Sequence, residues 1–122
     1  MRIRDDTPPT PRGINIALLF ALAAHRLSTW YEHGQWLSDA QGASLAADWL
    51  ARSKSALPLA ERRRLAALSD QFARQMAGTL SREAGLYAAH EMMEALDPNY
   101  HSELARSLLA ECERLLDDTE SP

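Results

Sequence analysis

A chain of 122 residues fits a single domain, and 46% hydrophobic with 25% charged residues is the balance of a globular protein that can form its own core. The mean hydropathy of −0.34 excludes a protein embedded mainly in a membrane. The single cysteine excludes an intrachain disulfide and the common zinc sites built on several cysteines, so we expect a cytoplasmic location.

The choice of apolar residues indicates the fold class. The chain has 21 Ala and 19 Leu, no Val, and no Ile beyond Ile16. Ala and Leu favour helices, whereas β-branched residues favour strands, so we predict an all-α protein. The preference for Arg over Lys, together with the excess of Ala, suggests a GC-rich bacterial or phage genome.

Three segments are expected along the chain: an extended, proline-rich arm over residues 1–13, a helical bundle over 14–117, and a polar tail over 118–122. The apolar run that begins at Ile14 ends at His25, which is too short for a membrane span of about 20 apolar residues. We therefore predict no membrane insertion.

The first two helices are predicted from apolar spacing and a capping signal. The first runs from about residue 14 into the thirties, and Ser38 with Gln41 has the spacing of a capping box that opens the second. The second should end before Pro58. The core side chains expected on these helices are Ile16, Phe20, Ala23, Leu27, Trp30, Leu37, Leu45, Ala46, Trp49 and Leu50.

Pro58 is suited to the first turn of a third helix, and Gly78 to its end. Thr79 is predicted to cap a fourth helix that ends at Asp97, and Asp97 with Pro98 to open a fifth. Five helices with short connections predict an antiparallel bundle. The core side chains expected on these three helices are Leu65, Leu68, Phe72, Met76, Leu80, Ala84, Ala88, Met92, Ala95, Leu96, Tyr100, Leu104, Leu108, Cys112 and Leu115.

One group of side chains could bind a metal ion. His90 and Glu94 lie one helical turn apart, a spacing at which an imidazole and a carboxylate can hold one divalent cation, and His101 could supply a further ligand. The other interpretation is an ordinary His–Glu pair on a solvated helix face, and we therefore predict no resident cofactor.

A second pattern lies in the first helix, where Arg26 is followed after six residues by His33. This spacing resembles the core motif of the helical ribonucleases called HEPN domains. The resemblance implies a ribonuclease in which His33 assists attack by the RNA 2′-hydroxyl and Arg26 is its partner in the motif. The alternative is a structural role for both side chains on one face of a helix.

A third pattern is the run Arg62, Arg63 and Arg64, which could contact phosphates if the chain is a subunit of a complex with nucleic acid. The overall pI of 5.5 favours a solvated helix face instead.

The distribution of charge favours binding to another protein. Residues 1–82 carry eleven basic and seven acidic side chains, a balance of +4, whereas residues 83–122 carry two and ten, a balance of −8. We expect a non-catalytic interaction protein, such as an adaptor, small subunit or inhibitor, whose acidic and aromatic surface binds a partner. Spare apolar surface would also allow a homodimer. The predicted interaction residues are Trp36, Glu91, Glu94, Glu103 and Glu111.

Overall fold

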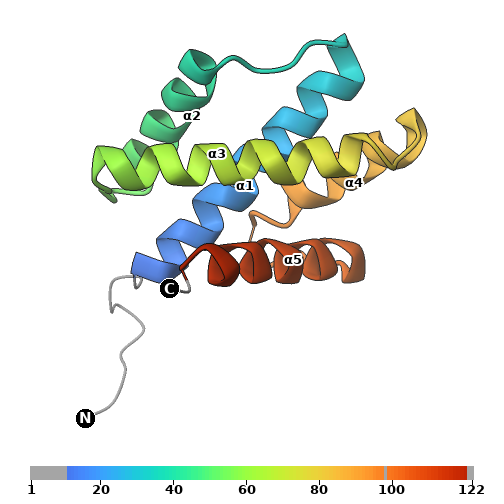
Figure 1. Cartoon of the computed structure of the whole chain (residues 1–122). Coiled ribbons are helices and arrows are strands. Elements are labelled where there is room, and N and C mark those ends of the chain that lie inside the picture. Colours follow the sequence, from blue (N-terminus) through green and yellow to red (C-terminus); the bar gives the residue numbers. More distant parts are fainter. Residues whose placement is uncertain (1–10, 98, 121–122) are drawn as a thin grey trace.

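The computed structural model describes residues 11–97 and 99–120, and this part of the chain folds into five α-helices without strands. The predicted all-α helical bundle is confirmed. Figure 1 shows α1 crossed by α3, with α3 and α5 running in opposite directions. The helices are α1 (Pro11–His33), α2 (Asp39–Arg52), α3 (Leu59–Ala77), α4 (Arg82–Glu94) and α5 (Glu103–Glu120).

The two ends of the chain differ in part from the predicted segments. Residues 1–10 of the expected arm lie outside the described residues, whereas Pro11 begins α1. A proline is well placed there because the first N–H of a helix has no intrahelical acceptor. At the other end α5 continues through Glu120, into the predicted polar tail, and residues 121 and 122 are not described.

Helix α1 is the central element of the bundle. It contacts each of the other four helices, and every side chain from Leu18 to Ala24 is at most 4% exposed. A helix that is apolar around its whole circumference belongs in the interior of a fold, and the stretch from Leu18 to Ala24 is buried in this way. Trp30, near the end of α1, is 38% exposed, which corrects its predicted place in the core.

Two of the predicted helix ends are confirmed. Ser38 accepts a hydrogen bond from the Gln41 backbone at 3.1 Å, and the Gln41 side chain accepts one from the Ser38 N–H at 2.9 Å. This capping box opens α2, while Leu37 lies before the helix. Gly78 ends α3 with its N–H bonded to the Arg74 carbonyl.

The caps of α4 and α5 correct the prediction. Ser81, not Thr79, caps α4 by accepting from the Ala84 N–H at 3.2 Å. The Ser102 hydroxyl accepts from the Ala105 N–H at the start of α5, while Asp97 accepts from the Asn99 N–H in the connection.

This later start of α5 leaves more of the α4–α5 connection outside the helices than predicted. Tyr100, Leu104 and Leu96 were predicted to be buried, but they are 36%, 37% and 38% exposed. Ala84 on α4 is also exposed. Cys112 and Leu115 do face the core as predicted.

Helices α1 and α4 meet at Tyr31 and Gly85. The Tyr31 ring lies directly against the Gly85 backbone, where an added Cβ would overlap with it. The Tyr31 hydroxyl donates to the Leu80 carbonyl at 3.1 Å, and the Arg82 Nε donates to the Tyr31 carbonyl at 3.2 Å. Gly85 is therefore required for this close approach of the two helices.

Helices α1 and α3 are joined by a buried arginine. The Arg26 side chain is 2% exposed, and its Nε donates to the Ser69 hydroxyl at 3.1 Å. Its Nη1 lies 3.4 Å from both the Leu37 carbonyl and the Asp70 Oδ1. Burial lowers the pKa of Arg26, while the carboxylates of Asp70 and Asp39 act in the opposite direction. The guanidinium thus links α1, the α1–α2 connection and α3.

Asp70 connects this arginine to the surface. Its Oδ1 accepts from the Trp36 indole at 2.6 Å, and its Oδ2 accepts from the Arg74 Nε at 2.9 Å. The Arg74 guanidinium also lies 4.6 Å from the Trp36 ring centroid, over its face. Partial burial alone would raise the pKa of Asp70, but the hydrogen bonds and the nearby arginines lower it overall.

We expect Asp70→Asn to lower the free energy of unfolding by about 3 kcal/mol, because it leaves the buried Arg26 charge without its closest carboxylate. The matched control is Asp48→Asn, since the Asp48–Arg52 pair is exposed, 62% and 72% at its two side chains. That change should cost less than about 0.5 kcal/mol. Urea denaturation of both variants measures the difference, and equal costs would contradict a structural role for the Arg26–Asp70 contact.

Candidate functional site

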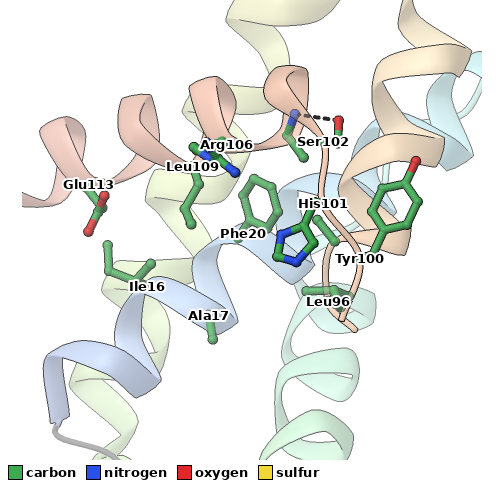
Figure 2. A pocket seen from close by; sticks show the side chains of 12 residues that line it. Ile16, Ala17, Phe20, Leu96, Tyr100, His101, Ser102, Arg106, Leu109 and Glu113 are labelled. Carbon is green, nitrogen blue, oxygen red and sulfur yellow. Dashed lines mark hydrogen bonds between the residues drawn. The ribbon is translucent and has the colours of Figure 1, made fainter. Parts of the chain in front are cut away.

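A groove opens between the first half of α1, helix α5 and the connection between α4 and α5 (Figure 2). Its volume is about 510 Å³, which lies within the range of small-molecule and side-chain binding sites. The twelve lining residues are Ile16, Ala17, Phe20, Ala95, Leu96, Tyr100, His101, Ser102, Ala105, Arg106, Leu109 and Glu113.

The floor of the groove is apolar and comes from two helices. Ile16 and Phe20 lie four residues apart on α1, and Ala105 and Leu109 have the same spacing on α5. Side chains four residues apart share one helix face, so each helix presents a short apolar strip to the groove. Leu96, from the α4–α5 connection, covers one end of the groove while remaining partly exposed.

One wall of the groove is held by a hydrogen bond between Tyr100 and Glu91. The Tyr100 hydroxyl donates to the Glu91 Oε2 at 2.6 Å, and the Glu91 side chain is only 7% exposed. Hydrogen bonds from Tyr100 and Ser102 lower the pKa of Glu91, and the hydrogen bond to Glu91 raises the pKa of Tyr100 to about 12. The carboxylate on α4 therefore fixes the connection that closes the groove.

The rim of the groove carries both signs of charge. Arg106 and Glu113 lie on α5, and His101 lies beside the Phe20 ring (Figure 2). Glu94 and Glu103 are exposed on the flanking helix ends. The mixture of an apolar floor with a predominantly acidic surround suits a ligand that combines apolar and basic groups.

The predicted interaction residues separate into two groups. Glu94, Glu103 and Glu111 are exposed, and Glu111 accepts a hydrogen bond from Arg114 at 2.9 Å. Glu91 does not belong to the acidic surface as expected, because it is buried against Tyr100. Trp36 is half-buried and committed to Asp70 and Arg74, and its ring meets Trp30 edge-on with centroids 5.4 Å apart.

The residues of the metal hypothesis do not form a joint site. His90 Nε2 lies 3.9 Å from Glu94 Oε1 on an exposed face, whereas His101 lines the groove. Among the residues that the structure describes, no group of three or more His, Cys, Asp or Glu side chains could hold a metal ion.

The residues of the ribonuclease hypothesis occupy different environments. Arg26 is buried and bonded to Ser69, Leu37 and Asp70, whereas His33 is exposed at the end of α1. An arginine that contacts RNA phosphate must be accessible, and the Arg26 guanidinium is not. The structure therefore gives Arg26 a structural role.

The Cys112 thiol, the only cysteine side chain of the sequence, is not accessible for reaction. The side chain is fully buried on α5. Burial, with the neighbouring charges of Glu111 and Glu113, raises the pKa of Cys112 to about 12. A protonated, enclosed thiol is a poor nucleophile, so Cys112 acts as a small apolar core residue.

Sequence reasoning missed the groove and the Arg26 network. An arginine next to the apolar run of residues 16–24 was a signal, since a charge in the core requires partners. The groove had no comparable signal, because its two apolar strips lie about 90 residues apart on helices with otherwise ordinary patterns.

Comparisons with models of protein families, with curated proteins and with solved structures each found no match. Within the described part of the chain, no helix is both long enough and apolar enough to cross a membrane.

We expect Tyr100→Phe to lower the urea midpoint at neutral pH, because Glu91 loses a donor while staying buried. The pKa of Glu91 is lowered in the folded chain, so this stabilisation is present above its ordinary value of 4.5 and is lost as the pH falls through the lower folded value. The difference between the native chain and the variant should therefore be smaller at acid pH, below 4.5, than at neutral pH.

The control for this experiment is Tyr87→Phe, since the Tyr87 side chain is 59% exposed on the same region of the surface. Its urea midpoint should match that of the native chain at both pH values. If the loss in urea midpoint caused by Tyr100→Phe were the same at both pH values, the stabilisation would not come from the hydrogen bond to the Glu91 carboxylate.

Proposed function

We propose that this chain is a non-catalytic interaction protein that binds a segment of another protein in the groove between α1 and α5. The segment would place apolar side chains on the floor formed by Ile16, Phe20 and Leu109, and basic side chains against the acidic surround. The observation that carries the proposal is an open, largely apolar groove of about 510 Å³ within the most acidic part of the chain.

The apolar part of the groove supports a peptide ligand. Leu96 and Tyr100 line it while remaining 38% and 36% exposed, and Leu104 nearby in the sequence is 37% exposed. Partly exposed leucine and tyrosine side chains around a concave site are typical of peptide-binding grooves, where they bury apolar anchors of the ligand.

The charge of the same region supports basic flanks. Residues 83–122, which include α5 and all of α4 except its first residue, Arg82, carry a balance of −8. Complementary charge at the rim accelerates encounter and disfavours acidic partners, while the apolar floor supplies most of the affinity.

The experiment is selection of peptides from a random phage-displayed library on the immobilised full chain, followed by titration of the selected peptides. We expect sequences that combine Leu, Ile, Phe or Trp with Lys or Arg. Selection of acidic peptides, or of none, would contradict the proposal.

Two pairs of variants locate the binding site. Glu113→Lys, at the rim, and Leu96→Ser, in the wall, should each weaken binding about tenfold, equivalent to about 1.4 kcal/mol. Glu83→Lys makes the same charge change on an exposed residue of α4, and Leu59→Ser removes an exposed leucine of α3; neither residue lines the groove. Binding that is weakened equally by the variants and their controls would place the peptide elsewhere.

A further inference from the structure

A second cavity, of about 620 Å³, lies between α2 and α3. Ala40, Ala43 and Ala46 line it from α2, and Ala66 and Ala67 line it from α3. Because the alanine side chains are small on both helices, they leave open space where larger residues would fill the contact. The walls are therefore apolar and smooth, and they are separate from the residues that line the groove described above.

Two arginines line this cavity. Arg62 and Arg63 lie near the start of α3, and neither forms an ion pair with a described residue. The Nε of Arg62 is enclosed and has no hydrogen-bond acceptor. A buried charged donor without an acceptor is unfavourable, so an acceptor bound in the cavity would relieve this cost.

The start of α3 adds to the positive potential. The helix begins at Leu59, which also lines the cavity, and Pro58 at its N-cap provides no side-chain hydrogen bond. The free N–H groups of the first turn and the helix dipole both favour a negative group near Arg62 and Arg63.

The negative charges of the two carboxylates that line the cavity are already balanced by other arginines. Asp70 accepts hydrogen bonds from Trp36, Arg74 and Arg26. Asp39 lies within the electrostatic reach of the buried Arg26 guanidinium. Since Arg26 and Arg74 balance these two acids, the charges of Arg62 and Arg63 remain available to a ligand.

We propose that this cavity binds a small anionic amphiphile, whose carboxylate or phosphate group is held by Arg62 and Arg63 and whose apolar chain lies on the alanine walls. The apolar walls favour an amphiphile over a free inorganic anion. The adjacent carboxylates of Asp39 and Asp70 disfavour a polyanion such as nucleic acid, which the sequence left open only as an alternative to a solvated helix face for the three arginines.

The test is titration of the full chain with decanoate and with decyl phosphate below their micellar concentrations, followed by calorimetry and by NMR. We expect one bound molecule, with shifts of backbone resonances at Ala43 and Ala66. Decanol has the same alkyl chain without the charge. It should bind at least about tenfold more weakly than the tighter anion. The tighter of the two anions identifies the head group, and decanol binding as tightly as both anions would overturn the proposal.

Matched variants separate this cavity from the peptide groove. Arg62→Gln and Arg63→Gln should each weaken binding of the tighter anion about tenfold, whereas Arg106→Gln removes the same charge from the groove and should leave it unchanged. Equal weakening by Arg106→Gln, or no binding of either anion to the native chain, would overturn the proposal. Helix content by circular dichroism confirms that each variant is folded, and failure of the peptide selection does not affect this result.

Discussion

The buried guanidinium of Arg26 is the interaction on which the arrangement of the first three helices depends. It lies in the central helix and bonds to Ser69 and Asp70 of α3 and to the Leu37 carbonyl before α2. Its Nη2 also approaches α2 so closely that a Cβ added at Gly42 would lie only 2.8 Å away. A charge in the core is tolerated only with such partners, so the position of Arg26 restricts how α1, α2 and α3 can be arranged.

The groove and the second cavity result from this arrangement of the helices and from the size of the side chains between them. Helix α1 is enclosed by its neighbours, and its apolar strip at Ile16 and Phe20 meets α5 where the Tyr100–Glu91 hydrogen bond holds the connecting segment. On α2 and α3, alanines face one another and leave the second cavity beside Arg62 and Arg63. The groove is lined mainly by residues of the acidic part of the chain and the other cavity lies beside arginines, so the ligands that we propose for the two sites carry opposite charges.

Local signals made the helices predictable, whereas the candidate sites depend on contacts between distant segments. The Ser38–Gln41 capping box and the core face of α3 at Leu65, Leu68, Phe72 and Met76 follow from spacing alone. The start of α5 was misplaced because Tyr100 bonds to Glu91 instead of joining a helix. The role of Trp36 was missed because its partner Asp70 lies 34 residues away, and no local pattern reports that contact.

The most direct test of this account is NMR observation of the arginine Nε–H groups at neutral pH. We predict that the Arg26 Nε–H gives a separate resonance that exchanges slowly with water and shows a nuclear Overhauser effect to Ser69, since it donates to the Ser69 hydroxyl at 3.1 Å. Arg52, whose side chain is 72% exposed, provides the fast-exchanging reference in the same sample. An Arg26 Nε–H that exchanges as fast as that of Arg52 would contradict the buried network and the arrangement of helices built on it.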